Sequence, residues 1–247
     1  MIIQYNKFSF ISHPFALAKF ALGRKMDLHE RMLVRSAKLL LGKKFDQSLS
    51  NQALNEIRAG DFIPMRNIPG VALPGNMPTY LFGKFLYYIV RCARPELMVE
   101  TGVAHGVSSW TILNAMHRNG TGNLYSIDLP NLDLKSYNPA NISQQSGWVV
   151  PDILRQRWEL QLGPSSELLP ALIKRLGKID IFFHDSDHSY DNMMFEFGAV
   201  YDSIKEEGLI LSDDVHKNNS FRDFVNSSNI CGIQFYTKGG AAVKRRQ

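Results

Sequence analysis

The feature that most constrains this fold is a regular alternation of short apolar segments with helix-forming segments, which begins after Pro95. Apolar runs of strand length that are separated by helices join as right-handed crossovers, so the pattern predicts an α/β fold with a mostly parallel sheet. The expected strands are Leu97–Thr101, Leu124–Asp128, Trp158–Leu162, Ile179–His184 and Leu209–Ser212. The expected helices are Ser108–Met116, Pro151–Arg157, Ser165–Leu176, Tyr190–Glu206 and Phe221–Val225.

The end of the chain predicts a pair of antiparallel strands. Cys231–Thr237 and Ala241–Arg245 have strand character, and the glycines of Lys238-Gly239-Gly240 between them favour a tight turn. We therefore expect a C-terminal antiparallel hairpin at one edge of the sheet.

The chain before the sheet is different in character. The segment to about Gly42 has helical periodicity, and Asn51–Met77, which contains three prolines, is interpreted as an irregular connector. A further helix is expected from Pro78 to Arg94. These boundaries predict an N-terminal helical extension and connector at residues 1–77 and a sheet domain at residues 78–247.

The positive charge is concentrated in the first fifty residues. The whole chain has a net charge of +5, but residues 1–50 hold nine basic and three acidic residues, so the remainder carries −1. The N-terminal helices therefore either form a basic amphipathic surface for anionic lipid or a partner, or cover the core or a homodimer interface. A sheet domain close to neutrality predicts no nucleic-acid partner.

Cysteine content and hydropathy bear on the expected compartment. Cys92 and Cys231 are the only cysteines, and they make neither a disulfide framework nor a zinc spacing. No apolar run approaches the roughly 18 residues of a spanning helix, and no secretory signal is expected. We expect a cytoplasmic protein, peripheral to a membrane if the basic segment docks there.

Residues after the first expected strand suit a small ligand with an amine and a carboxylate. Gly102 can adopt a positive φ, and Gly106 lets a ligand approach the start of the next helix. The N–H groups of that helix and the Ser108 hydroxyl can receive a carboxylate, whereas Glu100 offers a charge for an amine. An amine and a carboxylate form the amino-acid end of S-adenosylmethionine.

The next two strand ends suit a nucleoside. Asp128 ends the second strand, where a carboxylate accepts both ribose hydroxyls, and Ser165 or Ser166 would border an adenine. Ala104 stands where a dinucleotide-binding fingerprint has its second glycine, which disfavours NAD.

Carboxylates follow the fourth and fifth strands. Asp185, Asp213 and Asp214 are expected to meet, and without a nearby lysine or arginine they would need a shared cation such as Mg²⁺. His188, with a pKa near neutrality, is the candidate general base beside Asp185, and His184 receives no role.

Two stretches resemble a known family. VETGVAHGVSSWTILNAM resembles the cofactor motif of catechol-O-methyltransferase-like enzymes. IDIFFHDSDHSYDNMMFEFGAVYDSIKEEGLILSDDV is similar to the later motifs of macrocin-type sugar O-methyltransferases. The resemblance implies a class I methyltransferase with a seven-stranded Rossmann-like sheet and cofactor contacts at positions matching Glu100, Gly102, Gly106, Ser108, Asp128 and Ser165. It also implies metal ligands at positions matching Asp185, Asp213 and Asp214. Catechol-type enzymes carry a lysine base where this chain has His188, so the identity of the base stays open.

The sequence therefore predicts a metal-assisted, S-adenosylmethionine-dependent O-methyltransferase that acts on a hydroxyl of a small molecule or glycan. Two alternatives remain open. One is an NAD-dependent oxidoreductase, and the other is a non-catalytic scaffold that docks through its basic N-terminal helices.

Overall fold

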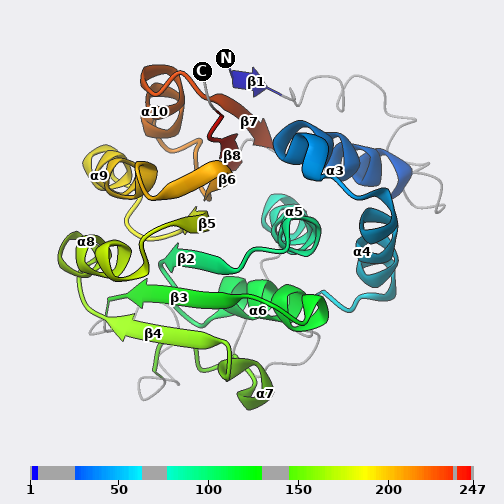
Figure 1. Cartoon of the computed structure of the whole chain (residues 1–247), viewed down its shortest axis with the longest axis horizontal. Coiled ribbons are helices and arrows are strands. Elements are labelled where there is room, and N and C mark those ends of the chain that lie inside the picture. The colour runs from blue at the N-terminus through cyan, green and yellow to red at the C-terminus, as the bar shows by residue number, and fades with distance from the viewer. Residues whose placement is uncertain (1, 5–25, 63–76, 130–144, 236–237, 246–247) are drawn as a thin grey trace.

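The protein is built on one eight-stranded sheet (Figure 1). The computed structural model describes residues 2–4, 26–62, 77–129, 145–235 and 238–245. Its strands are β1 (Ile2–Gln4), β2 (Leu97–Thr101), β3 (Asn123–Asp128), β4 (Trp158–Leu162), β5 (Ile179–His184), β6 (Ile204–Ser212), β7 (Cys231–Phe235) and β8 (Gly239–Val243). They follow the order β1-β7-β8-β6-β5-β2-β3-β4. All neighbouring pairs are parallel except those of β8, which lies antiparallel between β6 and β7.

The predicted α/β fold is confirmed, including the seven expected strands and the C-terminal antiparallel pair. The structure adds β1, which pairs with β7, although the N-terminus was expected to be helical. The expected helix Tyr190–Glu206 is also too long, because Ile204 already pairs with Ile179 as the first residue of β6.

Helices cover both faces of the sheet (Figure 1). They are α3 (Met26–Leu41), the 3₁₀ turn η1 (Gly42–Lys44), α4 (Gln47–Ala59), α5 (Met77–Ala93), α6 (Val107–Asn119), α7 (Asp152–Arg155), α8 (Ser165–Leu176), α9 (Tyr190–Tyr201) and α10 (Ser220–Ser227). Successive side chains of a strand point to opposite faces. Phe183 accordingly joins a core with α3 to α7, whereas Phe182 joins a second core with α8, α9 and α10.

The N-terminal helices belong to the first of these cores. Leu33, Ala37 and Leu40 of α3 are buried against it, as are Leu54 and Ile57 of α4. This supports the interpretation of the extension as a cover for the core and leaves those apolar side chains unavailable to a membrane. The connector predicted from Asn51 is wrong as far as Ala59, because that part is helical; residues 63–76 lie outside the described part of the chain.

A buried ion-pair network fastens α4 to α5 and α6. Both carboxylate oxygens of Glu56 accept hydrogen bonds from Arg91, each at 2.8 Å, and the Tyr87 hydroxyl donates to Oε2 at 2.8 Å. Arg91 is 4% exposed, and Arg118 of α6 lies 3.7 Å from Oε1 of Glu56. Burial works to raise the pKa of Glu56, but hydrogen bonds from Arg91 and Tyr87 outweigh it and lower that pKa.

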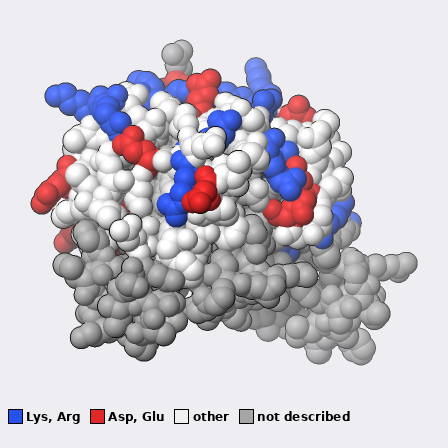
Figure 2. Space-filling view, turned by 90° about the horizontal axis from the view of Figure 1, so that it is seen from below, with Lys and Arg blue, Asp and Glu red and all other residues white. Residues whose placement is uncertain are grey.

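None of the helices within the described ranges is long and apolar enough to cross a bilayer. On the face seen from below in Figure 1, acidic and basic side chains of the described residues are intermixed (Figure 2).

Candidate active site

The site begins with the loop that joins β2 to α6. Gly102 has a φ of +84°, and a Cβ there would lie 2.1 Å from the carbonyl oxygen of Asp185, so only glycine fits. The Asp185 backbone N–H donates to the Thr101 carbonyl at 2.8 Å. Gly102 thus brings the ends of β2 and β5 into direct contact.

Gly106 packs closely against another segment of the chain, whereas the sequence predicted that a ligand would approach it. Its φ is +96°, and a Cβ would lie 2.7 Å from the Cα of Gly147. The Gly147 N–H also donates to the Ala104 carbonyl at 2.8 Å. The expected approach of a ligand at Gly106 is therefore occupied by the segment that contains Gly147.

Glu100 lies in the interior beneath this loop. Its carboxylate is fully buried and accepts hydrogen bonds from the hydroxyls of Ser108 (2.6 Å), Ser109 (2.6 Å) and Ser126 (2.7 Å). Burial raises the pKa of Glu100 to about 7, although the three hydroxyls favour the charged form. Glu100 and Ser108 are thus engaged with each other, where the sequence suggested that each would receive one end of a ligand.

Asp128 supports the loop from the end of β3. Its two carboxylate oxygens accept the backbone N–H groups of Val103 and Ala104, each at 3.1 Å. Each carboxylate oxygen has a second lone pair, so Asp128 can hold the loop and still accept hydroxyl groups from a ligand.

A cleft of about 320 Å³ opens above these strand ends. The described residues that line it are Gly102, Val103, Ala104, Ile127, Asp128, Leu129, Gly163, Pro164, Ser165, Ser166, Asp185, Ser186, Asp187 and Asn192. Four of the predicted site residues, namely Gly102, Asp128, Ser165 and Asp185, therefore meet in one cavity at the carboxyl edge of the sheet. Glu100, Gly106 and Ser108 lie below or beside it.

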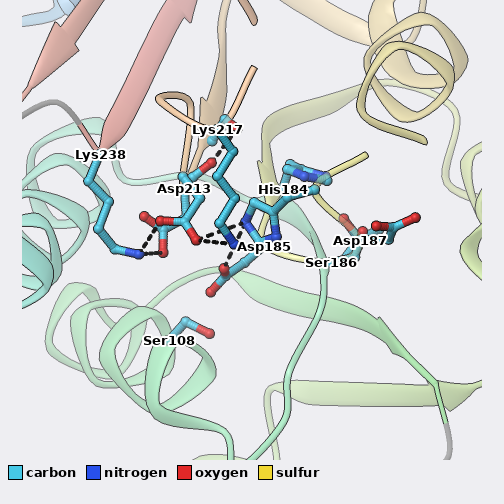
Figure 3. A network of polar contacts seen from close by, with 12 residues as sticks. Ser108, His184, Asp185, Ser186, Asp187, Asp213, Lys217 and Lys238 are labelled. Atoms are coloured by element: carbon cyan, nitrogen blue, oxygen red, sulfur yellow. Dashed lines mark hydrogen bonds and ion pairs between the residues drawn. The ribbon is translucent and has the colours of Figure 1, made fainter. Parts of the chain in front are cut away.

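The predicted acidic cluster forms, but it contains two lysines (Figure 3). The Lys238 ammonium lies 2.8 Å from Oδ2 of Asp213 and 2.5 Å from Oδ1 of Asp214, and Lys217 lies 2.7 Å from Oδ2 of Asp214. The premise that these carboxylates lack a nearby lysine is therefore wrong.

The lysines divide the cluster electrostatically. Burial works to raise the pKa of Asp214, but hydrogen bonds from Lys217 and Lys238 outweigh it and lower that pKa to about 2. Burial and the charge of Asp213 raise the pKa of Asp185 well above its usual value. Asp214 is thus a fixed anion, whereas Asp185 holds a proton more readily than an exposed aspartate.

The cluster does not fit the expected magnesium site. The described part of the chain contains no group of three or more His, Cys, Asp or Glu side chains arranged to hold a metal ion. Mg²⁺ requires several oxygen ligands in octahedral geometry. Here lysine ammonium groups occupy an oxygen of Asp213 and both oxygens of Asp214.

His188 lies beside the cluster. Its Nε2 is 3.7 Å from Oδ1 of Asp185 and 3.7 Å from Oδ2 of Asp214, and it has no hydrogen-bond partner among the described residues. Burial, together with the charge of His184, lowers the pKa of His188 to about 4. The imidazole is therefore neutral at pH 7, but it is a weaker base than the predicted pKa near neutrality implied.

A buried carboxylate behind the cleft was missed by the sequence reading. Glu196 of α9 is fully buried and accepts hydrogen bonds from Thr101 (2.5 Å) and Ser186 (2.7 Å). Nδ1 of His184 lies 2.6 Å from Oε2 of Glu196. Glu196 therefore holds the residues on both sides of Asp185, and the acidic residue within the apolar run MMFEFGAV was the signal that could have found it.

The family comparison bears on the same part of the chain. A family model described as a methyltransferase domain matches residues 99–215, which span β2 to the end of the acidic cluster. This part of the chain is therefore similar to a methyltransferase domain. The matched residues include every described residue that lines the cleft, and also Asp213 and Asp214.

Solved structures share this fold at low sequence identity. The O-methyltransferase TomG from Streptomyces achromogenes, solved with S-adenosylmethionine, is 17% identical, with a TM-score of 0.52 over 81% of this chain and 91% of TomG. The S-adenosylhomocysteine-bound Podospora anserina methyltransferase PaMTH1 is 13% identical, with a TM-score of 0.50 over 82% of this chain and 89% of PaMTH1. A Geobacter sulfurreducens methyltransferase is 18% identical, with a TM-score of 0.50 over 81% of this chain and 90% of its own. No curated protein sequence matches the chain.

Proposed function

We propose that this protein transfers the methyl group of S-adenosylmethionine to a hydroxyl oxygen of a small molecule or glycan. The observation that carries the proposal is the cleft in which Asp128, Ser165 and Asp185 meet at the carboxyl edge of the sheet. Ligands of open α/β folds bind at that edge. Two structures of the same fold, TomG and PaMTH1, hold S-adenosylmethionine or its product.

Each cleft residue then has a separate task. Asp128 accepts the ribose hydroxyls while it holds the β2–α6 loop through the Val103 and Ala104 N–H groups. Ser165, the first residue of α8, borders the adenine. When bound, the cofactor would supply a methyl group on a sulfonium, which an oxygen nucleophile attacks in line.

The acceptor hydroxyl must lose its proton during this attack, and Asp185 is the residue that we assign to receive it. Asp185 lines the cleft, and its raised pKa makes it a stronger base than an exposed aspartate. His188, neutral at pH 7 and 3.7 Å from Asp185, stands beside it as a second proton acceptor.

The test is thermal unfolding with S-adenosylhomocysteine, with NAD and with neither. A ligand at about one hundred times its dissociation constant stabilises a native protein by about 2.7 kcal/mol, which corresponds to about 5–10 °C for a domain of this size. We expect S-adenosylhomocysteine to raise the Tm and NAD to leave it unchanged. Stabilisation by NAD alone would instead favour an oxidoreductase, and no response to either would favour a scaffold.

A matched pair of variants localises the effect to the cleft. Asp128→Asn replaces one ribose acceptor by a donor, so it should shrink the S-adenosylhomocysteine shift. Asp152→Asn changes the same chemical group at a fully exposed position of α7 outside the cleft, and it should keep the wild-type shift. If both variants responded alike, Asp128 would not bind the cofactor.

A further inference from the structure

The hairpin between β7 and β8 places a lysine where a divalent cation was expected. Lys238 lies in that turn, and its side chain is 16% exposed. Its ammonium hydrogen-bonds Oδ1 of Asp214 at 2.5 Å and pairs with Oδ2 of Asp213 at 2.8 Å (Figure 3). One cation thus bridges the two adjacent carboxylates that directly follow β6.

The backbone holds Lys238 in this position from both sides. The Val215 N–H, one residue after Asp214, donates to the Lys238 carbonyl at 2.8 Å, and the Lys238 N–H donates to the Phe235 carbonyl at 3.0 Å. The next residue is Gly239, where a Cβ would lie 2.2 Å from the Phe82 ring. Gly239 therefore packs against α5, and Lys238 is held beside Asp213 and Asp214.

The surrounding charges show what the ammonium does. Asp185, Asp213 and Asp214 bring three carboxyl groups to one place, and Oδ1 of Asp213, a residue that is 7% exposed, has no hydrogen-bond partner among the described residues. Lys217 also bonds Asp214, but its side chain is 48% exposed. Lys238 is therefore the more deeply buried of the two lysines whose ammonium groups contact the cluster.

We propose that the Lys238 ammonium takes the place of a divalent cation in the Asp185–Asp213–Asp214 cluster, so that the methyl transfer proceeds without a metal. The proposal rests on the proposed function for the reaction, but the placement of the cation does not. A divalent ion that used the bonded oxygens of Asp213 and Asp214 would have to displace the ammonium. Lys238 is thus a positioning residue, which holds the two aspartates next to Asp185.

The decisive measurement is the binding of Mn²⁺ alone, followed by electron paramagnetic resonance, to the wild-type protein, Lys238→Met and Lys217→Met. Met keeps most of the side-chain length and removes the charge. We expect wild type and Lys217→Met to bind Mn²⁺ only weakly, and Lys238→Met to bind it at least about tenfold more tightly, because the cluster then lacks its buried cation. A merely structural lysine would not give this gain.

Two results would overturn the proposal. One is micromolar Mn²⁺ binding by the wild-type protein, and the other is a Lys238→Met variant that gains no more affinity than Lys217→Met. If Lys238→Met fails to fold, Mn²⁺ binding is compared between Lys238→Arg and the wild type. Arginine keeps the positive charge, so this variant should still exclude Mn²⁺. Tight Mn²⁺ binding by Lys238→Arg would refute the proposal.

The same samples separate this proposal from the proposed function. S-adenosylhomocysteine should raise the wild-type Tm whether or not EDTA is present. A Tm shift that required a divalent metal would contradict the role of Lys238. If S-adenosylhomocysteine gave no Tm shift but the Mn²⁺ measurements still showed that Lys238 excludes the metal, only the proposed methyltransferase activity would be refuted.

Discussion

Replacement of Glu100 by glutamine should change how the stability of the protein depends on pH. Glu100 is fully buried, and its pKa rises from 4.5 to about 7 on folding. A carboxyl group with a raised folded-state pKa favours folding at low pH, where it is neutral in both states. That advantage is lost as the pH rises from the unfolded pKa to the folded one.

The size of the effect follows from the shift. One pKa unit corresponds to about 1.36 kcal/mol, so the stability of the wild type relative to Glu100→Gln should fall by about 2.5 kcal/mol between pH 5 and pH 8. Glutamine retains the shape, and the hydroxyls of Ser108, Ser109 and Ser126 can rotate to accept from its amide. Any imperfection in these bonds adds an offset that does not vary with pH.

Urea denaturation of both proteins at pH 5, 6, 7 and 8 measures this difference. Every other group, including His188 and Asp214, titrates in both proteins, so their contributions cancel in the comparison. Two stability profiles that stay parallel over this range would refute the assignment of a neutral, buried Glu100 below neutral pH.

Three further substitutions test other parts of the structure. Gly102→Ala should cost about 3 kcal/mol or more, because its Cβ would overlap the Asp185 carbonyl, whereas Gly60→Ala, with a φ of +82° but open space, should cost only about 1 kcal/mol in urea denaturation. Equal costs would mean that the contact with Asp185 is not tight. Asp185→Asn should lower turnover about a hundredfold or more while S-adenosylhomocysteine still raises the Tm; loss of both would indicate unfolding rather than a missing base. Glu56→Gln should cost about 3–5 kcal/mol, because it leaves Arg91 buried without its anion, and a loss below about 1 kcal/mol would contradict the network.

The sheet could be predicted because its strands are short apolar runs separated by helices. Leu97–Thr101, Trp158–Leu162 and Ile179–His184 have the predicted bounds. The prolines at positions 64, 69 and 74 predict an irregular connector from Asn51 on, and that pattern obscures the second part of the helix Gln47–Ala59. The spacing of Ala53, Leu54 and Ile57, all buried in the structure, was the signal for one helical face.

The site could be predicted only where it follows strand ends. That rule brought Gly102, Asp128, Ser165 and Asp185 into one cleft without any knowledge of side-chain geometry. Lys238 escaped it because the lysine lies on the hairpin, 24 residues from Asp214, and reaches the cluster through tertiary packing that no local pattern encodes. The predicted metal site is not supported for the same reason. The local pattern does not show that Lys238 lies beside the aspartates, so it predicts a bound metal ion as their cation.

The union of the N-terminal helix with the last strands has a consequence during synthesis on the ribosome. α3 packs against β6 and β8, and Arg245 donates a hydrogen bond to the Leu39 carbonyl, 206 residues away. At about 5–20 residues per second, α3 would wait about 10–40 s for these partners to be translated. Until then α3 can pack only against partners made earlier, such as α5, so the part of its apolar face that β6 and β8 cover would stay exposed and open to chaperones.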